Sequence, residues 1–312
     1  MRLIDGLLQD TSRTFALSIP MLPVSLRDQV AISYLLFRIA DTIEDESSAA
    51  TNVRVELLRA IAHIDLATLG HSEQFRSVVT SIAPGADQVA CAMLMNHVHE
   101  VIDAYVMLPV SVQATIAAAL KRTCEGMADH LEADQPPETI EGLRAYCYTV
   151  AGIVGELLTD LFIAEQPELG TEHSLLFELA PYFGEALQLV NILRDESVDA
   201  ASQRWYVPKG VDRAELFDLA ERSLSSAGSY IDALARGGAS RGVVAFNVMN
   251  AALAAETLAL VRSSGPGVKV ARDRVLMLRD SLAKQDSDPF TSLTESFERA
   301  RLKPAVWMNT SR

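Results

Sequence analysis

The sequence contains little cysteine, and its few cysteines form no framework. Cys91, Cys124 and Cys147 are scattered through 312 residues, and no CxxC pair occurs. Small secreted proteins that depend on disulfides, and structural zinc sites, both need paired or clustered cysteines. The pattern therefore excludes both classes and predicts reduced thiols in a cytoplasmic setting.

Positive charge is also scarce. The chain has 27 basic and 41 acidic residues, which gives a formal net charge of −14 at pH 7. A protein with this charge has no general attraction for the phosphate backbone of nucleic acids. We therefore exclude a nucleic-acid partner and expect any bound anion to be held by a local group of basic side chains.

Long uninterrupted apolar runs are missing as well. The two longest apolar stretches, residues 29–43 and 245–261, contain polar or charged residues such as Arg38 and Glu256. Both fall short of the roughly 18 clean apolar residues that a membrane-spanning helix needs. Near the N-terminus, Asp5 interrupts any apolar core of a signal peptide. We expect two buried helices, no transmembrane segment and no secretion.

Several nucleotide-binding and catalytic motifs are absent. The sequence has no GxGxxG or GxxxxGK[ST] phosphate loop and no GxSxG turn. Dinucleotide-binding domains, P-loop NTPases and α/β-hydrolases are therefore excluded. His97 and His99 are two residues apart, so they do not share a helix face and do not indicate a metal site.

What the sequence does contain is a dense pattern of amphipathic helices. Of its residues, 49% are hydrophobic and 22% charged, and apolar residues recur at intervals of three and four. Breakers separate the helical patterns near residues 84–85, 135–137, 166–170, 208–210, 237–238, 263–267 and 286–289. These features predict an all-α bundle of about eight or more helices in a single domain, residues 1–312. Ligand sites in such bundles lie in the core between facing helices.

A first acidic face lies at the end of a predicted helix near residue 46. Asp41 and Asp45 are four residues apart, so both carboxylates lie on the same face. Arg38 and Tyr34 continue that face toward the N-terminus. Like charges in this arrangement destabilise a helix, and Mg²⁺, which proteins usually hold with one or two carboxylates, would compensate them. A solvated acidic helix end is the alternative interpretation.

A second acidic face occurs much later in the chain. Gln188, Asn191, Asp195 and Asp199 follow one another at spacings of three, four and four, which makes a polar stripe on an otherwise apolar helix. Two helices that each carry paired aspartates could hold metal ions from opposite sides, and such ions bridge to a diphosphate. A structural network of buried amides and acids is the alternative.

Five sequence blocks, in this order, resemble the squalene/phytoene synthase family, the head-to-head branch of the prenyl diphosphate synthases. They are SRTF at 12–15, YLLFR at 34–38, DTIED at 41–45, YCYTVAGIVG at 146–155 and NILRDESVD at 191–199. The resemblance covers roughly residues 10–208. It implies an all-helical isoprenoid synthase bundle around a central apolar cavity, in which two acidic motifs hold Mg²⁺ and the diphosphates of two allylic substrates.

The resemblance also implies roles for the charged residues. It assigns metal binding to Asp41, Asp45, Asp195 and Asp199, with Glu44 as an auxiliary ligand. It assigns contacts with the diphosphate oxygens to Arg13, Arg38, Arg194 and Arg204. These contacts are chemically reasonable because the paired donors of a guanidinium group match the oxygens of a phosphate.

Aromatic and small residues complete the implied site. Tyr146 matches a family tyrosine near the ionising diphosphate, where it would shuttle a proton or stabilise a cation; simple packing is the alternative. Phe15 and Tyr34 would offer ring faces to cations. Gly152 and Gly155, inside a helix, permit either an isoprenoid tail near the backbone or close helix packing. The remaining substrate contacts are assigned to Ser12, Gln188 and Asn191.

One position departs from the family pattern. The second motif usually reads DxxED, whereas this chain has Val198 where the glutamate would be. Glu196 lies about 100° around an ideal helix from Asp195, so it is a poor substitute. We expect metal affinity or substrate choice to differ.

The function expected from the resemblance is head-to-head condensation of two farnesyl diphosphates to presqualene diphosphate and squalene or dehydrosqualene. Phytoene synthesis from geranylgeranyl diphosphate is a close variant. Mg²⁺ is the expected ion, with Mn²⁺ as its substitute, and NADPH is needed only if the product is squalene. Another allylic-cation enzyme, such as a terpene cyclase, and a non-catalytic helical binding or assembly protein are the alternatives. We expect a cytoplasmic protein that touches the inner face of the membrane transiently.

Overall fold

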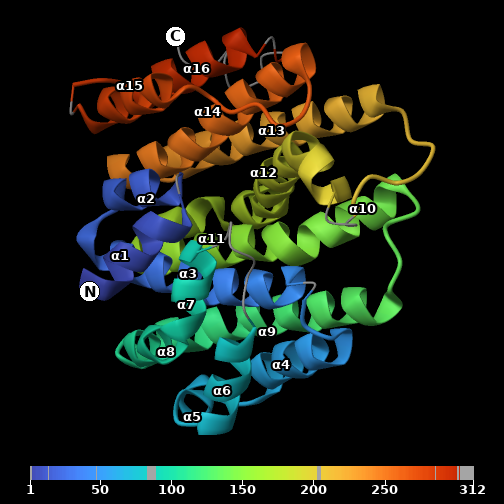
Figure 1. The fold of residues 1–312 in the computed structure, drawn as a ribbon. Coiled ribbons are helices and arrows are strands. Elements are labelled where there is room, and N and C mark those ends of the chain that lie inside the picture. Colours follow the sequence, from blue (N-terminus) through green and yellow to red (C-terminus); the bar gives the residue numbers. More distant parts are fainter. Residues whose placement is uncertain are drawn as a thin grey trace. The chain divides into compact units, whose positions relative to one another are not determined.

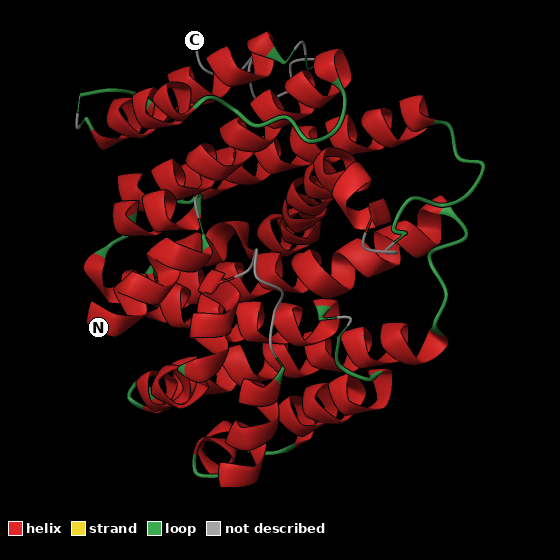
Figure 2. Cartoon of the chain, in the orientation of Figure 1, coloured by secondary structure: helices red, strands yellow, loops and turns green. Residues whose placement is uncertain are grey.

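The computed structural model describes residues 2–12, 14–46, 48–82, 89–201, 205–284, 286–300 and 302. Every regular element in these ranges is a helix, as Figures 1 and 2 show, so the predicted all-α class is confirmed. The helices pack into two compact units. Unit 1 holds the described residues up to Ile19 and from Val24 to Gln135, and unit 2 holds Pro20–Pro23 and the described residues from Pro136 onward. The expected single domain stays a prediction.

Unit 1 is built around one central helix. Its helices are α1 Arg2–Thr11, α2 Phe15–Ser18, α3 Val24–Asp45, α4 Thr51–His63, α5 Leu66–Gly70, α6 Glu73–Ser81, α7 Val89–Asn96, α8 Val98–Val106 and α9 Val110–Ala133. The 3₁₀ turn η1 Ile19–Met21 follows α2 and is divided between the two units after Ile19. Helix α3 packs against α1, α4, α7, α8 and α9. This is why it is apolar on several faces, with Leu35, Ala40 and Ile43 completely buried.

Unit 2 begins with a nearly continuous helix that contains a π turn. Its elements are α10 Ile140–Cys147, the π turn η3 Tyr148–Gly152, α11 Ile153–Glu165, the 3₁₀ turn η4 Pro167–Glu172, α12 His173–Ala201, α13 Arg213–Arg236, α14 Arg241–Ser264, α15 Arg272–Ala283 and α16 Pro289–Arg299. Helix α12 packs against α10, η3, α11, α13 and α14. The predicted breaks that fall within the described residues lie at or between helix ends; the one at 84–85 lies outside them.

Two helical stretches among the described residues are long and apolar enough to cross a membrane, Ile140–Glu165 and Arg241–Ser264. In α14, 89% of the most apolar window is buried inside the protein, which confirms the buried helix expected around residues 245–261. The corresponding window of Ile140–Glu165 is 39% buried.

The stretch formed by η3 and α11 touches α12 through the backbone. A Cβ atom added to Gly155 would lie 2.2 Å from the carbonyl oxygen of Ala180, and one added to Gly184 would lie 2.1 Å from that of Ala151. No side chain can occupy either position without separating the helices. Close helix packing therefore accounts for Gly155, while its contact with substrate stays a prediction.

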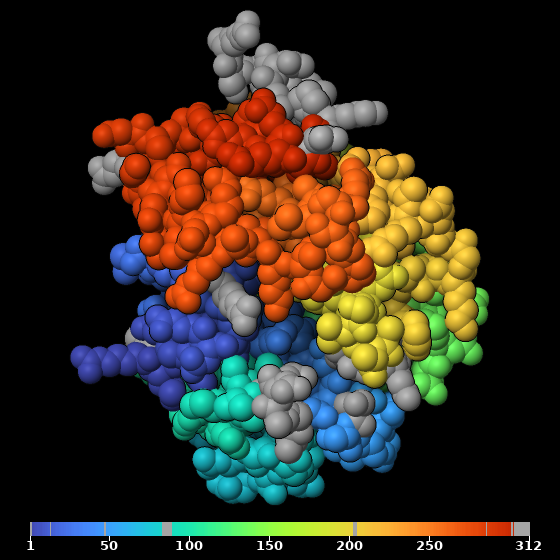
Figure 3. Space-filling view, turned by 45° about the horizontal axis from the view of Figure 1, so that its top comes forward, coloured from blue at the N-terminus to red at the C-terminus, as the bar shows by residue number. Residues whose placement is uncertain are grey.

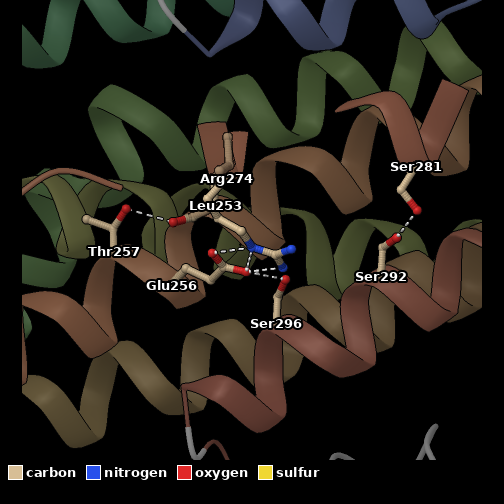
Figure 4. Close-up of polar contacts among 7 residues, drawn as sticks. All are labelled: Leu253, Glu256, Thr257, Arg274, Ser281, Ser292 and Ser296. Atoms are coloured by element: carbon tan, nitrogen blue, oxygen red, sulfur yellow. Dashed lines mark hydrogen bonds and ion pairs between the residues drawn. The ribbon is translucent and has the colours of Figure 1, made fainter. Parts of the chain in front are cut away.

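A buried carboxylate joins the last three helices of unit 2 (Figure 4). Glu256 of α14 accepts hydrogen bonds from Arg274 Nε at 3.0 and 3.1 Å, from Arg274 Nη2 at 2.6 Å and from Ser296 Oγ at 2.8 Å. The carboxylate has little contact with solvent, so it needs these donors. The cluster fixes α15 and α16 on α14.

We predict that Gly184→Ala lowers the free energy of unfolding by about 2 kcal/mol or more, because the new methyl group meets backbone atoms. Gly6→Ala in α1 is the control: nothing lies within 4 Å of its added Cβ. It should stabilise the protein by about 0.5–1 kcal/mol, the helix-propensity difference. Urea unfolding measures both. Equal effects of the two variants would contradict the close backbone contact.

We predict that Arg274→Met costs about 3 kcal/mol in urea unfolding, because it leaves the Glu256 carboxylate buried without its cation. The double variant Glu256→Leu/Arg274→Met should recover most of this loss, since an apolar pair needs no donor. A double variant as unstable as the single one would show that packing, and not charge, dominates the cluster.

Candidate active site

The acidic end of α3 has the predicted arrangement. The helix ends at Asp45, and Asp41 lies one turn earlier on the same face. Arg38 Nη1 lies 3.9 Å from Asp41 Oδ2. The Asp41 side chain keeps 37% of its surface exposed, yet its carboxyl group is crowded by protein. This burial, reinforced by Asp45 and opposed by Arg38, raises the pKa of Asp41 to about 7.

Arg38 is held on two sides. Its Nη2 donates to the Sγ of Cys91 on α7 at 3.6 Å, while Nη1 faces Asp41. Its Nε is buried with no hydrogen-bond acceptor among the described residues. Burial lowers the pKa of Arg38, but Asp41 and Cys91 favour the charged form and the net pKa is raised. Arg38 is therefore a permanent cation beside the aspartate pair.

Tyr34 extends this face toward the N-terminal helices. Its hydroxyl donates to the carbonyl oxygen of Thr11 at 3.0 Å, and its ring lies 5.3 Å from that of Phe15 at a 41° tilt. Burial raises the pKa of Tyr34, and Arg38 offsets part of the effect. Ser12 Oγ accepts from the backbone N–H of Phe15 at 2.9 Å. The structure thus brings Ser12, Phe15 and Tyr34 together, as the sequence predicts.

Glu44 has a different environment from its acidic neighbours. Its side chain is buried, whereas Asp41 and Asp45 are both partly exposed. Burial, with Asp41 and Glu44 as the nearest negative charges, raises the pKa of Cys124 on α9. Arg54 Nη1 donates to the backbone carbonyl of Glu44. The auxiliary role of Glu44 in metal binding stays a prediction.

The second acidic stripe lies along the C-terminal half of α12. Gln188, Asn191, Asp195 and Asp199 are all partly exposed, whereas the residues between them include the buried Leu189, Val190, Ile192 and Leu193. The predicted polar stripe on an apolar helix is therefore present in unit 2. Its partly exposed side chains are accessible to a ligand.

The side chain of Arg194 binds the carboxylate of the next residue, Asp195. Its Nε donates to Asp195 Oδ1 at 2.8 Å and its Nη2 to Asp195 Oδ2, a two-pronged contact of the kind that guanidinium groups make with carboxylates and phosphates. The Arg194 carbonyl accepts from the backbone N–H of Gly267 at 2.7 Å. Figure 3 shows the corresponding orange and yellow parts of unit 2 in contact.

The departure at Val198 has a clear structural setting. Val198 is 56% exposed, so nothing in the described part of the chain packs over it. Glu196 lies 3.3 Å from Arg213 of α13, away from the aspartate stripe, as expected from its position on the helix. Glu196 therefore does not replace the missing acid.

Tyr146 is buried next to the π turn. Its ring stacks on that of Tyr206 with centroids 5.0 Å apart and planes 24° from parallel. The π turn η3 begins two residues later; such turns occur frequently at functional sites. A Cβ atom on Gly152 would lie 2.7 Å from the ring of Tyr148.

Arg13 and Arg204, two of the four predicted diphosphate-binding arginines, lie outside the described residues.

A second polar feature of unit 2 was not predicted from the sequence. Buried Glu185 accepts from Arg144 Nε at 2.9 Å and from Ser223 Oγ at 2.6 Å. These residues line a cavity of about 680 Å³ formed by α10 and the residues 138–139 before it, α12, α13 and residues 209–211. None of the predicted site residues lines it, and the central apolar cavity implied by the resemblance stays a prediction.

Cys91 is the other residue that the sequence did not reveal. It lies 53 positions from Arg38, and no spacing rule connects the two.

Among the described residues, no three His, Cys, Asp or Glu side chains form a ready-made metal site. Each aspartate pair nevertheless offers the one or two carboxylates with which proteins usually hold Mg²⁺, so the donor chemistry suits that ion.

Comparison with solved structures identifies similar folds. The chain superposes on TcSQS, solved with the ligand BPH1237, with a TM-score of 0.72, 24% identity and coverage of 98% of this chain and 92% of that one. A dehydrosqualene synthase in complex with a ligand gives a TM-score of 0.58, 22% identity and coverage of 90% and 94%.

Sequence comparisons agree with these folds. The chain is 34% identical to squalene synthase BSS of Botryococcus braunii over 59% of this chain and 37% of that protein. It is 34% identical to the squalene synthase of Solanum lycopersicum over 61% and 42%, so the matches span less than half of these relatives. The family model for squalene/phytoene synthase matches residues 8–280. The chain therefore belongs to the squalene/phytoene synthase family.

Proposed function

We propose that the chain is a Mg²⁺-dependent prenyltransferase that joins two farnesyl diphosphates head to head. The product would be presqualene diphosphate and then squalene or dehydrosqualene. The single observation that supports this most strongly is the pair of aspartates one turn apart on each of α3 and α12, each with an arginine beside it, in a chain of this family. Phytoene synthesis from geranylgeranyl diphosphate is the close variant.

Mg²⁺ would be held by Asp41 and Asp45 in unit 1 and by Asp195 and Asp199 in unit 2, with Mn²⁺ as a substitute. When bound, the ion would supply positive charge to the departing diphosphate. The raised pKa of Asp41, caused mainly by burial of its carboxyl group and in smaller part by Asp45, supports this assignment, because a nearby divalent cation stabilises the charged form of both carboxylates.

Arginines would bind the diphosphate oxygens directly. Arg38 is charged and has unsatisfied hydrogen-bonding capacity at its buried Nε. Arg194 already holds a carboxylate in a two-pronged contact, and a phosphate presents the same pair of acceptor oxygens. We therefore expect a diphosphate to replace Asp195 as the partner of Arg194 while Asp195 turns to the cation.

The bond changes then follow from the substrates. The C–O bond of one allylic diphosphate breaks, pyrophosphate leaves with the electron pair, and the double bond of the second substrate attacks the cation. Loss of a proton closes the cyclopropane of presqualene diphosphate. Loss of the second pyrophosphate, followed by hydride from NADPH, gives squalene; a second proton loss instead gives dehydrosqualene. We assign a proton-transfer or cation-stabilising role to the buried Tyr146, and cation stabilisation to Phe15 and Tyr34.

The direct test is an assay of purified protein with farnesyl or geranylgeranyl diphosphate and Mg²⁺, with and without NADPH. Pyrophosphate release and mass spectrometry of the extract are the readouts. A C30 or C40 hydrocarbon supports the proposal. Pyrophosphate release with a C15 product would instead indicate a terpene cyclase, and no release with either substrate would indicate a non-catalytic helical member of the family.

We predict that Asp41→Asn and Asp195→Asn each reduce turnover on the order of a hundredfold, because each removes a charge that would stabilise the departing diphosphate through the cation. Asp28→Asn is the matched control, since Asp28 lies on α3 as well but is exposed. It should leave turnover unchanged. Loss of activity in all three variants, or in none, would argue against the assignment.

We predict that Mg²⁺ binds more tightly as the pH rises from about 6 to about 8, because the ion must displace the proton of Asp41, whose folded pKa is about 7. In metal-free protein the same raised pKa destabilises the fold as the pH rises from about 4 to about 7, since the unfolded state then loses its proton first.

Scanning calorimetry with EDTA checks the second effect. Asp41→Asn, which lacks the carboxyl group, should melt above the wild type at pH 8, and this difference should shrink at pH 5. Asp28→Asn should show no such trend. A difference between Asp41→Asn and the wild type that is the same at both pH values would contradict the raised pKa.

A further inference from the structure

The loop between α8 and α9 in unit 1 exposes a cluster of apolar side chains. Residues 106–110 read Val-Met-Leu-Pro-Val, and Met107 and Val110 are 84% and 81% exposed. Two side chains this exposed, only three positions apart, indicate that the loop forms a protruding tip. No charged residue occurs anywhere from Ala104 to Leu120. A charge-free segment of this length at a surface is unusual in a chain with 22% charged residues.

Part of the backbone of this tip is satisfied from within, although no described side chain caps the start of α9 after Pro109. Gln113 Nε2 donates to the carbonyl oxygens of Val106 and Leu108 at 2.9 and 2.7 Å. The N–H groups of Met107 and Leu108 donate to Asp103 and Tyr105, and Pro109 has no N–H. A loop in water has no need of this arrangement, because water satisfies its carbonyls. A loop that leaves water does need it, since each unpaired polar group then costs several kcal/mol.

We propose that residues 106–110 insert into the surface of a lipid bilayer. The tip is convex, and a fluid bilayer accepts a convex apolar tip, whereas a rigid protein partner would need a matching hollow. The net charge of −14 and the absence of basic residues in this segment mean that apolar insertion, and not attraction to anionic lipid, drives binding. The proposal uses no catalytic residue, so it stands apart from the proposed function.

A small cavity lined by both apolar and charged residues, among them Asp65 and Lys121, lies beside α4, α8 and α9. Ile64, 44% exposed, follows α4 and lines this cavity of about 250 Å³ together with Tyr105 and Ala118. In Figure 3 the teal and light blue helices α5 to α8 form the surface of this part of unit 1. The alternative to lipid is a second copy of the chain, in which the tip of one copy would bind in this cavity of the other.

The test is co-sedimentation of the full chain with phosphatidylcholine vesicles. We expect measurable partitioning that is weaker than the roughly 10⁴ M⁻¹ of a single myristoyl chain, because the tip buries fewer CH₂ groups. We also expect it to be unchanged by added salt and not increased by phosphatidylglycerol. Met107→Asp and Val110→Asp should each lower it about tenfold or more. Met277→Asp, at a similarly exposed position on α15 in unit 2, is the control and should bind like the wild type.

A second variant separates lipid insertion from ordinary loop stability. Gln113→Ala leaves the carbonyls of Val106 and Leu108 without a donor, which costs little free energy in water but several kcal/mol in lipid. The variant should therefore bind vesicles more weakly, while the melting temperature of the protein stays close to that of the wild type. Absence of wild-type binding, or binding that salt abolishes, would overturn the proposal. A wild-type dimer that Met107→Asp converts to monomer, without vesicle binding, would assign the tip to a second copy.

Discussion

The constraint on which this structure depends is the repulsion between carboxylates placed one turn apart on helices that are otherwise built for a core. On α3, the Asp41 and Asp45 pair lies at the end of a helix that packs against five neighbours, and burial, reinforced to a smaller extent by Asp45, raises the pKa of Asp41 to about 7. A core helix has no structural use for such a pair. Strongly perturbed carboxylates of this kind cluster at functional sites, which makes this pair a candidate for one.

The two acidic helices meet this constraint in different ways. On α3, Nη1 of Arg38 lies 3.9 Å from Oδ2 of Asp41, and Nη2 of Arg38 donates a hydrogen bond to the thiol of Cys91. On α12 the adjacent arginine closes directly on Asp195 with two hydrogen bonds. In both units the arginine offsets the negative charge of an aspartate. Local positive charge is thus present in a strongly acidic protein.

The repeating features of the site could be predicted from sequence, because helical period alone places Asp41 above Asp45 and aligns Gln188 with Asn191 and the later aspartates. Contacts set by tertiary packing could not. Nothing in the spacing connects Cys91 with Arg38, and a contact between adjacent residues such as Arg194 and Asp195 runs against the rule that neighbours on a helix face apart. Gly155 was recognisable as unusual inside a helix, but only tertiary packing shows that it faces the backbone carbonyl of Ala180, and nothing in the sequence pointed to the matching contact of Gly184 with Ala151.

The π turn between Tyr146 and α11 has a geometric consequence. It accommodates one residue more than a regular helix would over the same rise, so α10 and α11 are rotated relative to each other. Deleting any single residue from 148–152 would restore a straight helix and turn the ring of Tyr146 by about 100° relative to the glycines that follow. A change in the length of this segment would therefore reorient Tyr146, whereas a substitution that keeps its length would leave the ring in place.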